Sequence, residues 1–142
     1  INEFKTQLIN YDGILCNYYR NKTNYKNMPF FSTKSNLRWF GALHELLYCD
    51  NYYNLNFYTN ENIKIYQYKT GNSWTNITEK WKNYLILIED FVKNTDKNHE
   101  LYPRWIFYLA QTYYDNKNYA KALQTYEQRV NFDFGYKEEI YI

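Results

Sequence analysis

Residues 103–129 contain two stretches with helical periodicity: Pro103-Arg-Trp-Ile-Phe-Tyr-Leu-Ala-Gln-Thr-Tyr-Tyr-Asp115 and Tyr119-Ala-Lys-Ala-Leu-Gln-Thr-Tyr-Glu-Gln-Arg129. A proline suits the first turn of a helix, because the N–H that it lacks would be unpaired there. The residues from Asp115 to Asn118 have the composition of a turn. We therefore expect a helical hairpin whose second helix ends near Val130. The apolar side of that second helix is predicted to hold Ala122, Leu123, Tyr126 and Val130.

A third amphipathic segment precedes this hairpin. Thr78 is the expected N-cap, and apolar residues then recur at spacings of three and four up to about Lys93. The pattern predicts a helix over residues 78–93. Its apolar side is predicted to hold Trp81, Tyr84, Leu85, Leu87, Ile88, Phe91 and Val92.

The first half of the chain has a different character. Its short β-prone runs are bounded by Asn, Asp, Gly or Lys, residues that are common in turns. Residues 37–48 fit either a short helix or a strand that leads into a loop. We expect an α+β fold, with an α/β lobe over residues 1–75 and a helical unit over residues 76–142. The β-prone runs are residues 13–19, 28–32, 54–58 and 63–68.

Composition and charge exclude several classes of protein. The 142 residues are 45% hydrophobic and have a net charge of +2, which is far from the basic balance that sequence-independent phosphate binding needs, so we expect no nucleic-acid partner. Cys16 and Cys49 form no CxxC or Cys/His pattern, which favours free thiols in a reduced compartment. No run approaches the roughly 18 apolar residues of a membrane span. These features predict a cytoplasmic protein, and the abundance of Asn, Lys, Ile and Tyr suggests an A/T-rich genome, such as that of a large virus or a protist.

The hairpin resembles a tetratricopeptide repeat. Ala110 and Ala122 stand where small residues let the two helix backbones approach, with large side chains on either side. Arg129 stands where the repeat usually has a small residue, so the unit is atypical. Since one repeat cannot bury its own apolar face, the helix over 78–93 and a further one from Lys137 are the expected neighbours. The matching positions are Leu109, Ala110, Tyr113, Tyr119, Ala122 and Tyr126.

Together with Gly135-Tyr-Lys-Glu-Glu139, the same hairpin is similar to the C-terminal region of a group of family 2 glycosyltransferases. In that group a GT-A catalytic domain runs directly into a tetratricopeptide-like tail. A second stretch agrees: Tyr19-Arg20 and Leu37-Arg-Trp-Phe-Gly-Ala-Leu-His-Glu-Leu-Leu47 resemble the last portion of the GT-A domain, where a His-Glu pair closes the active site. The resemblance covers most of the chain from about Tyr18 onward, and residues 49–70 are its least specific part.

The resemblance implies roles for four residues. His44 is the candidate ligand of a Mn²⁺ or Mg²⁺ ion, or else a hydrogen-bond donor to the diphosphate of a nucleotide sugar. Glu45 would orient the histidine, brace the loop or face the acceptor. Trp39 would stack on a sugar face, and Arg38 would meet a phosphate oxygen. Judged from the residues alone, a lone histidine beside leucines is more often structural, and Trp39 fits a plain core position equally well.

One sequence feature of GT-A enzymes is missing. No Asp-x-Asp motif occurs in the 142 residues, so we expect this chain to be inactive alone. It begins with Ile1 and ends inside what reads as a new helix, which is the expected appearance of a piece of a longer enzyme. That inverting, metal-dependent enzyme would take a nucleotide sugar and a glycan or protein acceptor. The alternative is a non-catalytic helical module that binds a protein partner, and a third hypothesis, carbohydrate binding through exposed aromatic residues, rests on composition only.

Overall fold

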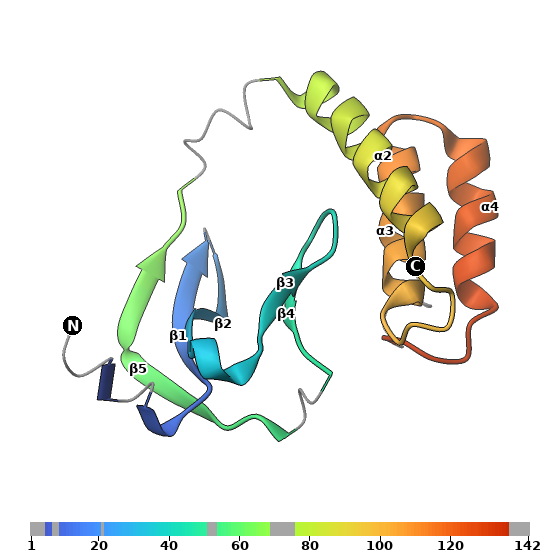
Figure 1. Cartoon of the computed structure of the whole chain (residues 1–142). Helices are drawn as coiled ribbons and strands as arrows, with labels where there is room; N and C mark the ends of the chain where they lie inside the picture. Colours follow the sequence, from blue (N-terminus) through green and yellow to red (C-terminus); the bar gives the residue numbers. More distant parts are fainter. Residues whose placement is uncertain (1–4, 7–8, 21, 51–53, 69–75, 137–142) are drawn as a thin grey trace. The chain divides into compact units, whose positions relative to one another are not determined.

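The computed structural model describes residues 5–6, 9–20, 22–50, 54–68 and 76–136 (Figure 1). The chain divides into two compact units. The sheet unit consists of Ile1–Phe40 and Leu46–Gly71, and the helical unit consists of Gly41–Glu45 and Asn72–Ile142. A sheet in one unit and helices in the other confirm the α+β class. Within the described ranges, no helix has both the length and the apolar character needed to cross a membrane.

The sheet unit is built on a three-stranded mixed sheet. The central strand, β1 (Gly13–Arg20), is antiparallel to β2 (Thr23–Phe31) and parallel to β5 (Phe57–Tyr66). The sequence predicts two separate runs at 54–58 and 63–68, and this prediction is wrong because β5 is one strand. Its pairing with β1 is interrupted where the register passes from Cys16 to Asn17, so the polar residues in the middle of β5 form an irregularity rather than a turn.

Residues 37–48 adopt the second of their two predicted conformations. β3 (Arg38–Phe40) and β4 (Leu46–Tyr48) form an antiparallel pair joined by a loop, so the helical alternative is wrong. A short 3-10 helix, η1 (Thr33–Ser35), precedes them and is capped by Ser32, whose side chain accepts a hydrogen bond from the Lys34 N–H. The apolar cluster of this unit consists of Met28, Leu37, Leu47 and Cys49, packed against Leu15, Phe31, Leu55 and Phe57.

Three helices form most of the helical unit: α2 (Ile77–Asn94), α3 (Tyr102–Asp115) and α4 (Tyr119–Val130). All three predicted helices are confirmed, but the predicted cap of the first is wrong. Asn76, not Thr78, is the N-cap of α2. Its side-chain oxygen accepts from the Glu79 N–H at 3.3 Å, and its amide donates to the Glu79 carboxylate at 2.6 Å. This reciprocal pair resembles a capping box.

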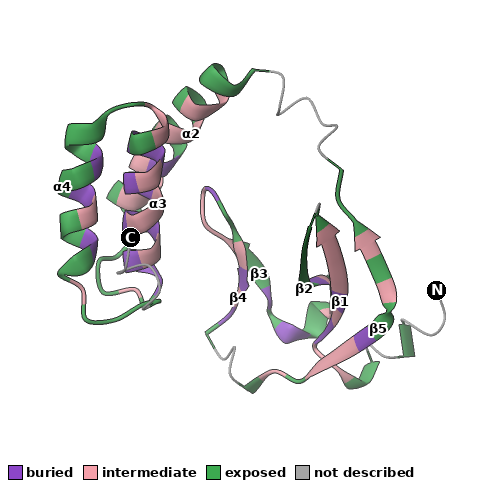
Figure 2. Ribbon diagram, turned by 180° about the vertical axis from the view of Figure 1, so that it is seen from behind, coloured by how far each residue is buried: buried purple, intermediate pink, exposed green. Residues whose placement is uncertain are grey.

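The buried sides of the helices differ from the predicted ones at three leucine and valine positions. On α2, Ile88 is fully buried, whereas its neighbour Leu87 is 52% exposed. On α4, Leu123 and Val130 are 62% and 55% exposed. Figure 2 shows the buried residues of α4 along the side that faces α3. A helix turns 100° per residue, so a position next to a buried one points well away from the core. The buried residues of α4 are Ala122, Thr125 and Arg129.

A polar network joins the three helices beside their apolar core. The Tyr113 hydroxyl of α3 donates to the Glu89 carboxylate of α2 at 2.5 Å, and the Lys121 ammonium of α4 lies 4.0 Å from the same carboxylate. Burial, together with this hydrogen bond and the charge of Glu89, strongly raises the pKa of Tyr113. Tyr113 is therefore a neutral donor under physiological conditions. The further helix predicted from Lys137 lies outside the described residues.

Candidate functional site

The loop Gly41–Glu45, between β3 and β4, belongs to the helical unit. Gly41 has a φ of 117°, and a Cβ at this position would collide with the Trp105 ring. Leu43 is buried in the core cluster of the helical unit. The loop is therefore fixed at both positions by packing against helices that follow it in the chain. The buried residues around Leu43 are Ile88, Leu109, Tyr113 and Ala122.

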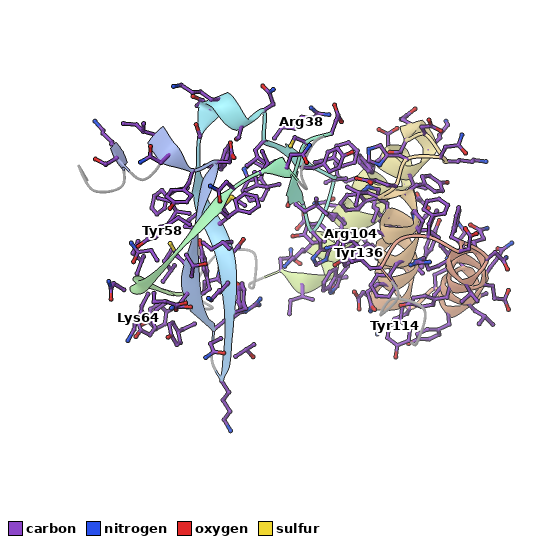
Figure 3. All side chains as sticks on the ribbon, turned by 90° about the horizontal axis from the view of Figure 1, so that it is seen from below. Arg38, Tyr58, Lys64, Arg104, Tyr114 and Tyr136 are labelled. Atoms are coloured by element: carbon purple, nitrogen blue, oxygen red, sulfur yellow. The ribbon has the colours of Figure 1, made fainter. Side chains whose placement is uncertain are left out.

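His44 comes directly after the buried leucine and lies against α3. Its φ is 52°, and its ring stacks on Tyr108 with the ring centroids 4.2 Å apart and an angle of 13° between the planes. Arg104 lies one helical turn before Tyr108, with its guanidinium carbon 4.8 Å from the centre of the same ring. The guanidinium also lies 5.2 Å from the Tyr136 ring centre, and Figure 3 shows these two side chains together. We call His44, Arg104, Tyr108 and Tyr136 the His44 cluster.

The cluster changes the protonation of His44. The His44 side chain is exposed overall, but the loss of water where its ring lies on Tyr108 is the main cause that lowers the pKa of His44, and the positive charge of Arg104 lowers it further. The charge of Glu45 acts in the opposite direction. His44 is therefore neutral at pH 7. As the pH falls below about 6.5, His44 is protonated in the unfolded chain before it is protonated in the folded chain. Acidification therefore favours the unfolded state and lowers the free energy of unfolding.

Replacing Arg104 with Gln is expected to raise the pKa of His44, because it removes a positive charge that disfavours the imidazolium. The pKa should stay below about 6.5, since the stack on Tyr108 still keeps water from one face of the His44 ring. An NMR titration of the histidine ring protons measures both values. His99, whose Nδ1 accepts a hydrogen bond from the Leu101 N–H, supplies the control signal in the same spectra. An unchanged His44 midpoint in Arg104→Gln would show that the two groups do not interact electrostatically.

The other three predicted site residues have different surroundings. Glu45 is exposed, and within the described residues it forms no hydrogen bond with His44. Arg38 and Trp39 lie on β3 and belong to the sheet unit, not to the helical unit that holds His44. The Arg38 guanidinium is 3.8 Å from the Asp50 carboxylate, and both side chains are exposed. Trp39 is 57% exposed, so the core alternative for this residue is wrong.

The donor set around His44 does not fit a divalent cation. In the part of the chain that the structure describes, no three His, Cys, Asp or Glu side chains come together as metal ligands. Mn²⁺ and Mg²⁺ need several oxygen ligands, and the nearby Arg104 charge would repel a cation. A guanidinium with five N–H donors and an imidazole with one N–H suit an anion instead.

Sequence reasoning missed Arg104, Tyr108 and Tyr136. The spacing of Arg104 and Tyr108 places them on one side of α3, but no local pattern indicates that a distant histidine covers that side.

The chain matches no protein-family model, and no curated protein resembles it significantly.

Proposed function

We propose that this chain is the C-terminal part of a glycosyltransferase that transfers a sugar from a nucleotide-sugar donor to a glycan or protein acceptor. In this proposal the sheet unit belongs to the acceptor-side end of a GT-A domain, and the helices form an attached tetratricopeptide-like unit. The observation that carries it is the docked loop, which holds His44 against Tyr108 beside Arg104. The sequence resemblance implied a role for the same histidine.

The chemistry of sugar transfer accounts for this arrangement. When the bond between sugar and diphosphate breaks, negative charge develops on the departing phosphate oxygens, and fixed donors that stabilise this charge lower the barrier. Arg104 supplies a permanent positive charge, and neutral His44 supplies an N–H whose direction is set by the stack on Tyr108. We therefore assign His44 to the diphosphate rather than to a metal ion. The Mn²⁺ or Mg²⁺ ion of a complete enzyme would need ligands other than the described residues.

The proposal is tested by adding inorganic pyrophosphate to the 142-residue chain and following the histidine ring signals by NMR. We expect a saturable shift of the His44 signals and a rise in the pKa of His44, because a bound anion favours the imidazolium. The His99 signals should stay unchanged. In Arg104→Gln, the affinity should fall about tenfold, which corresponds to about 1.4 kcal/mol.

UDP is the second probe, because it carries the same diphosphate on a nucleoside. A UDP titration should move the same His44 signals as pyrophosphate does. If neither probe moves the His44 signals, or if both histidines shift together without saturation, the assignment to a diphosphate is wrong.

A specific observation also favours the alternative, a non-catalytic helical module that binds a protein partner. The outer side of α4 presents Leu123 and Val130, both more than half exposed, and Tyr119 at 59% exposure. Apolar residues in a row on one helix side are typical of surfaces that bind another helix. Under this alternative, pyrophosphate has no specific site, so the NMR titration separates the two proposals.

A further inference from the structure

One face of the three-stranded sheet carries polar and aromatic side chains from β1, β2 and β5. Successive residues of a strand point to opposite faces, so Asn17 and Tyr19 of β1 share one face. In register with Asn17 are Lys26 on β2 and Lys64 on β5, and in register with Tyr19 is Tyr66 on β5. Residues directly opposite each other on paired strands lie on the same face. We call this surface, completed by Glu61 of β5, the tyrosine face.

Two tyrosines provide its flat apolar surface. The rings of Tyr19 and Tyr66 stack with their centroids 5.2 Å apart and an angle of 23° between their planes. Tyr66 lies on β5, an edge strand of the sheet, and is 57% exposed. Contact between the two rings holds both in place before a ligand arrives, which reduces the entropy lost on binding.

A fixed carboxylate lies beside the rings. Glu61 accepts a hydrogen bond from the Lys26 ammonium at 2.7 Å on one oxygen and from the Asn17 amide at 2.8 Å on the other. The hydrogen bond from Lys26 is the main cause that lowers the pKa of Glu61, so this group is ionised across the neutral range. Each carboxylate oxygen can accept a second hydrogen bond, and the ammonium has further protons to donate. Three strands therefore present ordered acceptors and donors that remain open to solvent.

Charge decides which ligand this face fits. Lys26 is neutralised by Glu61, and Lys64, which extends from β5 (Figure 3), adds one positive charge. An ionised carboxylate in the middle of the face repels phosphate groups, whereas nucleic-acid binding requires several uncompensated cations. A sugar ring instead offers C–H groups to an aromatic surface and neighbouring hydroxyls to a carboxylate.

We propose that the tyrosine face binds a neutral oligosaccharide, with a sugar ring packed on Tyr66 and its hydroxyls bonded to Glu61, Asn17 and Lys26. This binding site goes beyond the proposed sugar transfer and does not depend on it, because all its residues belong to the sheet unit. The pyrophosphate experiment reads out His44 of the helical unit, so one proposal can fail while the other holds.

The test uses the intact chain and four neutral probes: maltohexaose, cellohexaose, chitohexaose and mannohexaose. Isothermal titration calorimetry should show saturable binding of at least one of them. Tyr66→Ala should lower its affinity about tenfold or more, equivalent to about 1.4 kcal/mol, and Tyr66→Phe should keep it. The control is Tyr114→Ala in the helical unit, because Tyr114 is similarly exposed at 55% and should have no effect. A thermal melt of each variant shows whether the sheet unit still folds.

A second variant separates sugars from nucleic acids. Glu61→Gln removes the charge but keeps the shape of the side chain, so it should weaken oligosaccharide binding severalfold. The wild-type chain should not bind oligo(dT) at physiological salt. The proposal is overturned if none of the four probes binds, if Tyr66→Ala binds as well as the wild type, or if oligo(dT) binds and Glu61→Gln strengthens that binding.

Discussion

Gly41→Ala is expected to lower the free energy of unfolding of the helical unit by about 3 kcal/mol or more. Gly41 has a φ of 117°, which side-chain-bearing residues rarely adopt, and its added methyl group would collide with the Trp105 ring. Backbone strain costs about 1–3 kcal/mol, and inserting an extra group into a packed region costs a similar amount. Urea unfolding followed by tryptophan fluorescence measures the loss. The His44 ring signals should also move toward those of a solvated histidine, because the loop no longer holds the stack on Tyr108.

Gly135→Ala is the matched control for this experiment. Gly135 also has a positive φ, 91°, but the nearest atom to an added Cβ is the Pro103 Cβ at 3.1 Å, a milder overlap than the collision with the Trp105 ring at Gly41. The control should therefore lose clearly less stability than Gly41→Ala and should leave the His44 signals in place. Equal losses in the two variants would mean that strain at φ, and not the Trp105 contact, limits substitution at Gly41.

Ile88→Ala should lower the free energy of unfolding of the same unit by about 2–5 kcal/mol, the range for emptying a large aliphatic site in a core. Ile88 is fully buried in the cluster that also holds Leu43, Leu109 and Tyr113. Urea unfolding with the same fluorescence signal gives the value. The melting temperatures of the wild type and of Ile88→Ala provide an independent comparison of their stabilities.

The adjacent residue supplies the control. Leu87 is 52% exposed, so Leu87→Ala should change stability by no more than about 0.5 kcal/mol. The two substitutions remove apolar side chains of the same size from consecutive positions, and only their orientation on α2 differs. Similar losses of stability in the two variants would contradict the orientation of α2, in which Ile88 faces the core and Leu87 faces solvent.

The helices could be predicted from the sequence because each repeats its apolar pattern over several turns. The predictions that were wrong concern features that single residues determine, namely the N-cap of α2 and the buried side of α4. Asn76 and Thr78 are both good capping residues, and only the reciprocal bonds between Asn76 and Glu79 select the first. Leu123 and Val130 look like core residues, but burial of Arg129 and Ala122 on α4 leaves them outside.

The strands and the candidate site were harder to predict, because both depend on contacts distant in sequence. The polar residues around Glu61 look like a turn, and only the pairing of β5 with β1 on both sides of them keeps them inside one strand. The resemblance of the surrounding sequence made His44 a candidate, and its role stays a prediction. Its partners Arg104 and Tyr108 could not be predicted, since they come together only when the loop packs on α3.

The position of the loop Gly41–Glu45 in the sequence has a consequence for folding during synthesis. It belongs to the helical unit but precedes α2, α3 and α4 in the chain. During synthesis from the N-terminus, Leu43 therefore leaves the ribosome before any of its core partners, and the last of them, Ala122, follows only when α4 is made. An mRNA truncated before the codon of residue 119 would yield a chain without α4. Its three-stranded sheet could still pair completely, but the loop Gly41–Glu45 would have no complete core to pack against.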